Sequence, residues 1–151
     1  MSLQCVVFIG LPASGKSTFY RQRFAATHTH ISKDLLPGSA NKSARQARDL
    51  RAALGAGQSV VVDNTNPAVA GRAEIIGEAR RLGARVIGYY FAATARDCVG
   101  RNRAREGTAR VPPVAIFTAA KRLVVPAKQE GFDELWQVTI RPDGGFDVES
   151  M

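Results

Sequence analysis

The sequence predicts an α/β fold in which helices cover both faces of a central, mostly parallel sheet. Short apolar stretches of strand length alternate along the chain with longer stretches of helical character. This alternation is typical of parallel strands joined by crossover helices. The apolar residues 5–9 also lead into a glycine-rich turn and then into a stretch without proline or glycine. Strand, turn and helix in this order predict the first β–α unit of such a fold.

The remaining elements follow in the same alternation. We expect strands at residues 4–9, 30–32, 59–63, 85–91, 135–140 and 146–148. We expect helices at residues 18–26, 42–56, 67–83 and 114–125, and a further helix between Thr94 and Gly107. Asn66 followed by Pro67 is a typical N-cap and first-turn pair, and Thr94 is expected to cap the helix that follows it.

The glycine-rich turn carries a phosphate-binding sequence. Residues 10–18 read GLPASGKST and match the P-loop (Walker A) pattern GxxxxGK[ST]. Its glycines let successive backbone N–H groups point at one anion, and the following helix N-terminus adds partial positive charge. Lys16 is expected to reach the β- and γ-phosphates, and Ser17 to place its hydroxyl on Mg²⁺. We therefore expect a P-loop NTPase fold with nucleotide contacts from Gly10, Ala13, Ser14, Gly15, Lys16, Ser17 and Thr18.

Two carboxylates are expected beside the P-loop. Asp34 follows the second strand and Asp63 ends the third, and ligands bind at the carboxyl ends of parallel strands. Asp63 follows three valines, as a Walker B aspartate does, and is expected to hold Mg²⁺ with Ser17; the alternative is a turn or cap residue. Asp34 is either the general base toward an acceptor hydroxyl or a turn residue before Pro37.

Basic residues are concentrated late in the chain. The formal net charge is +8, from 21 Lys and Arg against 13 Asp and Glu, which suggests an anionic partner. Arg101 and Arg105 are four residues apart, so a helix places them on one face, and Arg103 points elsewhere. We expect residues 94–113 to form a helical lid whose Arg101 and Arg105 contact the phosphates. A closing lid excludes water and favours an alcohol acceptor over hydrolysis.

Length and composition limit the class of protein. A chain of 151 residues has the size of one domain, so we expect a single domain over residues 1–151. No apolar stretch reaches the roughly 20 residues of a membrane span, so no membrane partner is expected. Cys5 and Cys98 are expected to be unpaired thiols in a reducing cytoplasm. No oligomeric state is predicted.

Several segments taken together resemble a known family. They are Gly10–Thr18, Ile31–Asp34, Asp63–Pro67, Arg101–Arg105 and Val111–Pro112. In this order they look like the kinase domain of 5′-hydroxyl polynucleotide kinases, including the kinase half of the polynucleotide kinase-phosphatase repair enzymes, over about residues 4–140. The resemblance implies ATP and Mg²⁺, and transfer to the 5′-OH end of DNA or RNA. It implies Asp34 as general base and Arg105, with Arg101, on the phosphates; with Lys16 these are the expected catalytic groups.

The chain departs from this family on the acceptor side. Ser32-Lys33 stand where the family commonly has Asn-Arg, and Pro37 stands where some members carry a basic residue. Two alternatives therefore remain: a kinase for a sugar, nucleoside or antibiotic, and a nucleotide-binding module without transfer activity. The chain also has no Asp-x-Asp phosphatase motif, so a 3′-phosphatase is not expected in it.

Overall fold

A computed structural model describes residues 2–151, except for the side chain of Thr108, and contains a six-stranded sheet. The strands are β1 (Gln4–Gly10), β2 (Thr29–Ile31), β3 (Val60–Asp63), β4 (Arg85–Phe91), β5 (Glu134–Ile140) and β6 (Phe146–Ser150). Their order in the sheet is β2-β3-β1-β4-β5-β6. The first five strands are parallel to their neighbours and β6 is antiparallel to β5. The predicted mostly parallel sheet is thus confirmed.

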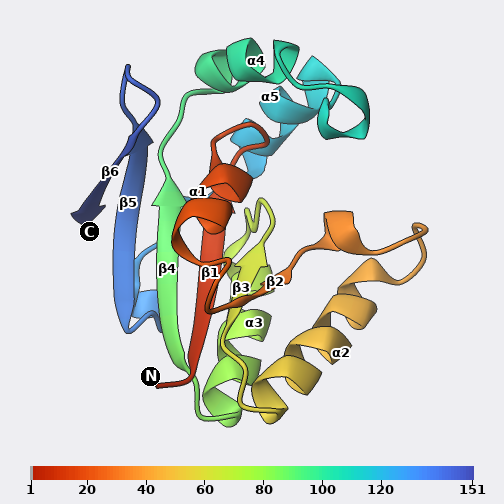
Figure 1. Ribbon diagram of the computed structural model, residues 1–151, viewed down its shortest axis with the longest axis vertical. Helices are drawn as coiled ribbons and strands as arrows, with labels where there is room; N and C mark the ends of the chain where they lie inside the picture. Colours follow the sequence, from red (N-terminus) through yellow and green to blue (C-terminus); the bar gives the residue numbers. More distant parts are fainter. Residues whose placement is uncertain (1) are drawn as a thin grey trace.

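Helices lie on both faces of the sheet (Figure 1). They are α1 (Lys16–Arg23), α2 (Lys42–Gly55), α3 (Val69–Arg81), α4 (Ala95–Arg103) and α5 (Pro113–Arg122), with short 3₁₀ turns η1 (Lys33–Leu35), η2 (Gly107–Ala109) and η3 (Lys128–Glu130). Leu50 of α2 and Ile76 of α3 share one core cluster with Val7 of β1, whereas Phe19 of α1 packs with Phe8 in a second cluster on the opposite face. α4 and α5 lie beyond the carboxyl ends of the strands, above the P-loop (Figure 1).

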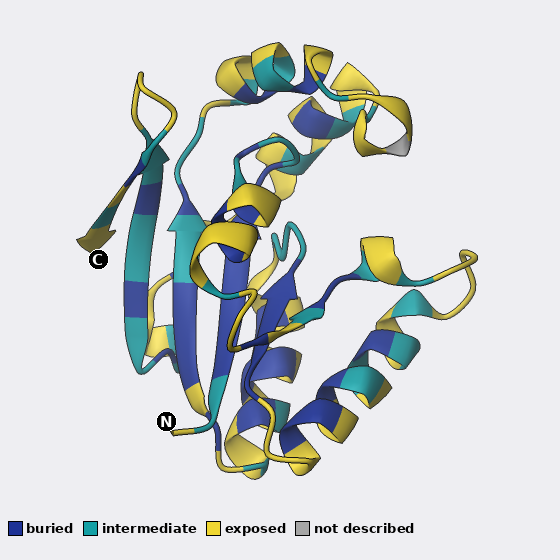
Figure 2. Cartoon of the chain, in the orientation of Figure 1, coloured by how far each residue is buried: buried dark blue, intermediate teal, exposed yellow. Residues whose placement is uncertain are grey.

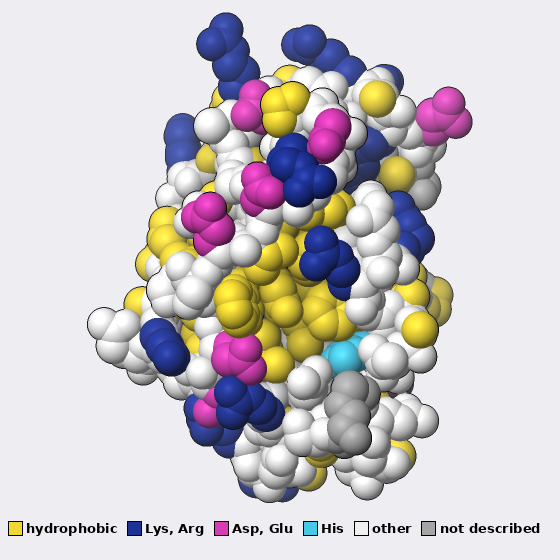
Figure 3. All heavy atoms as spheres, turned by 60° about the vertical axis from the view of Figure 1, so that its left-hand side comes forward, with side chains coloured by type: hydrophobic (Ala, Val, Ile, Leu, Met, Phe, Trp, Pro, Cys, Tyr) yellow, Lys and Arg dark blue, Asp and Glu magenta, His cyan; other side chains and the backbone are white. Residues whose placement is uncertain are grey.

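The centre of the sheet is fully buried, while the α1 face is less completely covered. Residues Cys5–Ile9 of β1 are all 0% exposed, and β1 and β3 lie in the interior (Figure 2). On the α1 side, Phe24, Tyr89 and Trp136 are only partly buried against the aromatic cluster. Hydrophobic side chains are accordingly visible over the middle of this side in the space-filling view (Figure 3).

The loop after β3 differs from the expected helix start. α3 begins at Val69 with Ala68 as its N-cap, so the prediction that Asn66 caps this helix is wrong. Asn66 has a left-handed φ of 46°, and its Nδ2 donates to the carbonyl oxygen of Phe8 at 2.7 Å. The side chain therefore joins this loop to β1, and the left-handed backbone of Asn66 is not the extended conformation that an N-cap residue needs. By contrast, Thr94 caps α4 as expected, because its hydroxyl accepts the N–H of Asp97 at 3.1 Å.

Other boundaries shift by a few residues for local reasons. The helix expected at 18–26 begins at Lys16 and ends at Arg23, because Phe24 leaves the helix and its ring packs against that of Phe8 at 5.9 Å. The helix expected at 114–125 ends at Arg122, because the chain becomes extended and Val124 donates its N–H to the carbonyl of Pro67.

Two further features concern the cysteines and the length of the helices. Cys5 and Cys98 are free and buried, as expected of unpaired thiols. Within residues 2–151, every helix is too short or too polar to cross a bilayer.

Candidate functional site

The loop between β1 and α1 has the backbone of an anion-binding nest. Ala13 and Gly15 adopt positive φ angles of 63° and 94°, which turn their N–H groups toward the inside of the loop. A Cβ at Gly10 would lie 2.8 Å from Cβ of Phe91 and 2.9 Å from Oγ of Ser14, so only glycine fits there. Oγ of Ser14 is buried and has no hydrogen-bond partner among the described residues, which leaves a polar group available inside the loop.

Lys16 lies inside this loop, and its charge is sensitive to the other residues singled out from the sequence. Its Nζ donates to the carbonyl oxygens of Gly10 at 3.0 Å and Leu11 at 2.7 Å. Burial penalises the ammonium and lowers the pKa of Lys16 from 10.5 to about 8. The carboxylates of Asp63 and Asp34 oppose this lowering, whereas Arg105 adds to it. The fold thus brings Asp34, Asp63 and Arg105 into electrostatic reach of Lys16.

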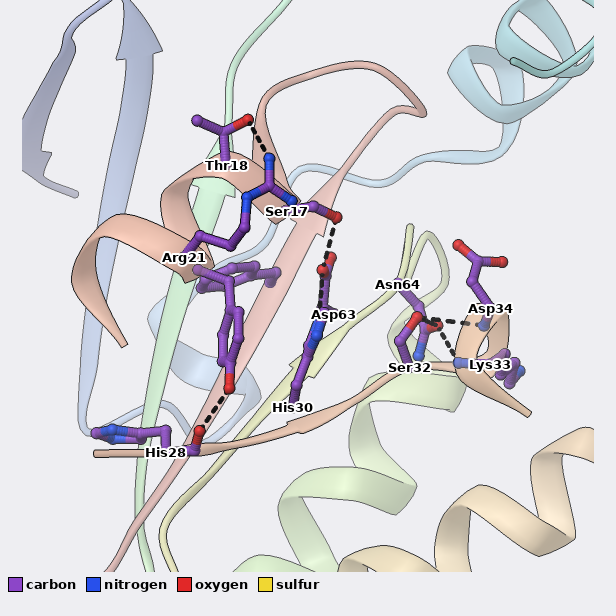
Figure 4. A network of polar contacts seen from close by, with 12 residues as sticks. Ser17, Thr18, Arg21, His28, His30, Ser32, Lys33, Asp34, Asp63 and Asn64 are labelled. Atoms are coloured by element: carbon purple, nitrogen blue, oxygen red, sulfur yellow. Dashed lines mark hydrogen bonds and ion pairs between the residues drawn. The ribbon is translucent and has the colours of Figure 1, made fainter. Parts of the chain in front are cut away.

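Ser17 and Asp63 meet at the carboxyl ends of β1 and β3. Oγ of Ser17 donates to Oδ2 of Asp63 at 3.1 Å, and Nε2 of His30 contacts the same oxygen at 2.8 Å (Figure 4). The His30 ring stacks on Tyr20, with ring centroids 4.0 Å apart. Asp63 is 5% exposed, so its position is fixed by these contacts. His30 was expected only as a strand residue; in the structure it pairs with Val61, which places it on the same face of the sheet as Asp63.

Asp34 is presented by η1 with its carboxylate free. Oγ of Ser32 caps this turn by accepting the N–H of Asp34 at 3.2 Å, and Oδ1 of Asn64 accepts the N–H of Lys33 at 2.9 Å. The Asp34 carboxylate is exposed, accepts no hydrogen bond within the described part of the chain, and points away from these contacts in Figure 4. Asp34 therefore lies in a turn, which agrees with the second interpretation of this residue. The capping contact of the turn comes from Ser32 and not from Asp34.

Asn64 is a second residue whose contacts the sequence analysis missed. Besides accepting from Lys33, it donates through Nδ2 to Oε1 of Gln46 in α2 at 2.7 Å. One amide therefore links the end of β3, η1 and α2. The position of Asp34 depends on this link as well as on the local turn.

Arg101 and Arg105 do not share a helical face, so that prediction is wrong. α4 ends at Arg103, so Arg105 lies beyond the helix and does not share a helical face with Arg101. Nevertheless, Arg101 and Arg105 are both half-buried, whereas Arg103 is exposed. Nε of Arg101 and Nη1 of Arg105 are buried without a hydrogen-bond partner among residues 2–151. Unpaired N–H donors of this kind fit an anion, because a buried donor is costly unless it is paired.

Two features fix the lid segment (residues 94–113) over the P-loop. The side chain of Asn102 donates to the carbonyl of Val111 at 2.7 Å and accepts the N–H of the same residue at 3.0 Å. Below it, Leu11 of the P-loop packs with Cys98 of α4 and Ile116 of α5 in one buried cluster. The positions of Arg101 and Arg105 are therefore tied to the loop that holds Lys16.

A buried arginine holds the loop after β3. Arg72 of α3 is 0% exposed and donates to the carbonyls of Asn66 at 2.9 Å and Pro67 at 3.1 Å. It also makes a bidentate pair with Glu130, at 2.8 and 3.0 Å. Because this loop also carries Asp63 and Asn64, Arg72 supports the site from behind.

Replacing Arg72 with alanine should destabilise the fold strongly. Breaking a buried ion pair from one side leaves an unpaired charge, here Glu130, and costs about 3–5 kcal/mol. Arg80 of the same helix is the matched control, because its contact with Asp133 is at the surface and Arg80→Ala should cost less than about 1 kcal/mol. Urea unfolding of the two variants measures both values; equal losses would mean that the Arg72 network is not a stabilising element.

A sequence profile described as an AAA domain matches residues 5–126 of the chain. The chain belongs to this AAA domain family. The match includes the P-loop, Asp34, Asp63 and residues 94–113, whereas Glu130 lies just beyond it.

Individual relatives of this AAA domain are distant. A protein of Acanthamoeba polyphaga mimivirus, described as a bifunctional polynucleotide phosphatase/kinase, is 29% identical over 143 residues, which is 90% of this chain and 33% of that protein. The chain thus spans about a third of the length of this curated relative.

Solved structures with the same fold include kinases for different acceptors. A gluconokinase from Sinorhizobium meliloti aligns with a TM-score of 0.65 and 18% identity, covering 92% of this chain and 84% of that one. A fungal RNA kinase aligns with a TM-score of 0.67 and 18% identity, covering 91% of this chain and 38% of that one. At this identity the likeness shows the fold alone, which this chain shares with both of these kinases.

Proposed function

We propose that this AAA domain is an ATP-dependent kinase that transfers a phosphoryl group to the 5′-hydroxyl end of a nucleic acid. The observation that carries the proposal is geometric: the P-loop backbone encloses Lys16, and the Ser17 hydroxyl beside it contacts the Asp63 carboxylate at 3.1 Å. Asp34 and Arg105 lie near enough to influence the charge of Lys16. A phosphate cradle, an uncommitted carboxylate and cationic side chains at one place are what phosphoryl transfer requires, because positioning and charge stabilisation dominate its catalysis.

The phosphates of ATP are assigned to the P-loop and the lid. Backbone N–H groups of this loop, such as those of Ala13 and Gly15, would surround the β-phosphate, and Ser14 would supply its unpaired hydroxyl. Lys16, Arg101 and Arg105 neutralise the negative charge that spreads over the transferring group. We also propose that residues 94–113 act as the lid of a single kinase domain.

The residues around Ser17 fit a magnesium ion. Oxygen ligands are what Mg²⁺ prefers, and it usually binds one or two carboxylates together with phosphates and waters. The Ser17 hydroxyl and the Asp63 carboxylate lie 3.1 Å apart, and a self-sufficient cluster of three or more metal-binding His, Cys, Asp or Glu side chains is absent from the described chain. Ser17 and Asp63 would hold the ion, which when bound would supply charge neutralisation of the phosphates.

Asp34 is assigned the role of general base. Its exposed carboxylate can accept the proton of the acceptor hydroxyl as the new oxygen–phosphorus bond forms. The bond between the γ-phosphorus and the bridging oxygen then breaks, and ADP leaves with that oxygen. Ser32 and Asn64 act as positioning residues, because they hold the turn that presents Asp34.

The choice of a nucleic-acid acceptor is supported by the motifs around Asp34, Asp63 and Arg105 and by the description of the mimivirus relative. A small-molecule kinase is the second candidate. It is favoured by the replacement of Asn-Arg with Ser32-Lys33 at the acceptor side, where Ser32 is buried in a capping contact. A nucleotide-binding module without transfer activity is the third.

Salt dependence separates a nucleic-acid acceptor from a small molecule. Each phosphate contact to a single strand should contribute about −0.7 to the slope of log affinity against log salt. We expect KM for a 5′-OH oligonucleotide to rise steeply with salt. Neutralising exposed basic residues such as Arg103 or Arg110 should reduce the slope of log KM against log salt. KM for ATP in the same variants is the control. If KM for the acceptor changes neither with salt nor with oligonucleotide length, the result would support the small-molecule kinase instead.

A further inference from the structure

A groove of about 860 Å³ lies between α2 and α3 and begins at Asp34. At the carboxyl edge of the sheet it is lined by Asp34 and Asn64, and at its far end by Arg51, Glu78 and Arg81. The volume is in the range of ligand-binding pockets. An acceptor whose hydroxyl lies at Asp34 can therefore extend into this groove.

The far end of the groove is closed by a bridge between the two helices. Arg51 of α2 contacts Glu78 of α3 at 3.3 Å, and Arg81 contacts the other oxygen of Glu78 at 2.5 Å. On α2 the lining runs from Ser43 to Arg51, eight residues apart, which at 1.5 Å per residue is about 12 Å. At a stacking distance of 3.4 Å per nucleotide this is room for about three bases.

The lining is apolar along the floor and has no net charge. Leu50 and Ile75 line its deepest part but are only 2% and 9% exposed, so the accessible apolar surface comes from Ala47, Pro67 and Ala68. Three cationic and three anionic residues line the walls, namely Lys33, Arg51, Arg81, Asp34, Glu74 and Glu78. A surface of this kind suits nucleobases, which carry no charge. It does not suit a row of phosphates, which attracts clustered Lys and Arg.

We propose that this groove binds the unpaired bases of the first two or three nucleotides of the acceptor, with the 5′-hydroxyl at Asp34. The inference rests on the proposed function, because it takes the acceptor to be a nucleic acid. It adds that the end is single-stranded: bases stacked on one another along the groove present their edges to it, and in a duplex those edges are covered by the partner strand. The phosphates then lie at the groove's outer side.

Two glycines on the groove wall make the test specific. Gly71 and Gly77 of α3 line the groove, and a Cβ at either position would meet nothing within 4 Å. Gly71→Leu therefore fills groove space without pressing on the core. Gly55 of α2 has the same open surroundings but lies outside the groove, so Gly55→Leu is the matched control. Gly77→Leu is a second filling variant for the case that Gly71→Leu fails to fold.

The experiment measures KM and kcat at saturating ATP for single-stranded 5′-OH oligonucleotides of two to six nucleotides and for a blunt duplex. We expect Gly71→Leu to raise KM for the single strands roughly tenfold, with kcat and the thermal midpoint retained, and Gly55→Leu to match the wild type. The wild type should prefer the single strand to the duplex, and its gain with length should level off at about three nucleotides.

The outcomes separate this inference from the proposed function. If the wild type phosphorylates oligonucleotides and a folded Gly71→Leu or Gly77→Leu variant keeps the wild-type KM, the groove assignment is wrong while the kinase assignment stands. An equal preference for the blunt duplex would overturn the single-stranded end in the same way. If the wild type phosphorylates no oligonucleotide, the nucleic-acid acceptor and the groove inference both fail.

Discussion

Lys16→Ala should reduce phosphoryl transfer roughly 10²–10³-fold, the usual effect of removing one group that stabilises charge in the transition state. The reason is the position of the ammonium inside the P-loop, where it is buried and can be offered to the β- and γ-phosphates. Nucleotide affinity should fall as well, because the same contact is made with bound ATP. Steady-state transfer kinetics and calorimetric titration with a non-hydrolysable ATP analogue measure the two effects.

The fold of Lys16→Ala should survive. Burial lowers the pKa of Lys16 to about 8, which means that the folded state binds its proton less tightly than the unfolded chain does, so the charged side chain does not stabilise the fold near neutral pH. Lys128→Ala, at an exposed lysine in η3, is the matched control and should retain both activity and affinity. A folded Lys16→Ala protein with wild-type turnover would remove the P-loop from the mechanism.

Asp34→Asn should reduce transfer about 10²–10⁴-fold, because the amide keeps the shape of the side chain but cannot accept a proton. The Asp34 side chain is exposed and free of hydrogen bonds to the described residues, so the thermal midpoint should not change. ATP affinity should also stay close to that of the wild type, since Asp34 is assigned to the acceptor. The measurements are kcat, KM for ATP and a melting curve.

Asp49→Asn in α2 is the control for Asp34→Asn, because Asp49 makes only a 3.8 Å surface contact with Arg48. It should leave kcat unchanged. Should Asp34→Asn turn over at the wild-type rate, Asp34 would be a turn residue only, and another group would have to accept the proton.

The sequence predicts the fold well where local patterns suffice. Three consecutive valines before Asp63 indicate a central strand buried on both faces, and β3 has this burial. The P-loop pattern predicts both a strand and a helix start, and both are found, although α1 begins at Lys16 rather than Thr18. In these cases the signal lies within a few adjacent residues, so no knowledge of tertiary contacts is needed.

The contacts that complete the site come from segments far apart in the sequence. Arg72 and Glu130 are 58 residues apart, as are Asn66 and Phe8, and no periodicity relates them. Asn66 also departs from its local preference, because the loop holds it in a left-handed conformation and bonds it to β1 in place of a helix cap. The placement of Arg105 depends likewise on the reciprocal bonds between Asn102 and Val111, which close the chain after α4.

The central claim is transfer of the γ-phosphoryl group of ATP to the 5′-hydroxyl of a nucleic acid. The most direct measurement uses ATP labelled on the γ-phosphate with 5′-OH DNA, 5′-OH RNA, the same oligonucleotides already carrying a 5′-phosphate, and a panel of sugars, nucleosides and other small alcohols. We predict label at the 5′ end of a 5′-OH oligonucleotide and none on its 5′-phosphorylated counterpart. Label on a small alcohol alone, or tight ATP binding with no labelled acceptor of any kind, would contradict the account.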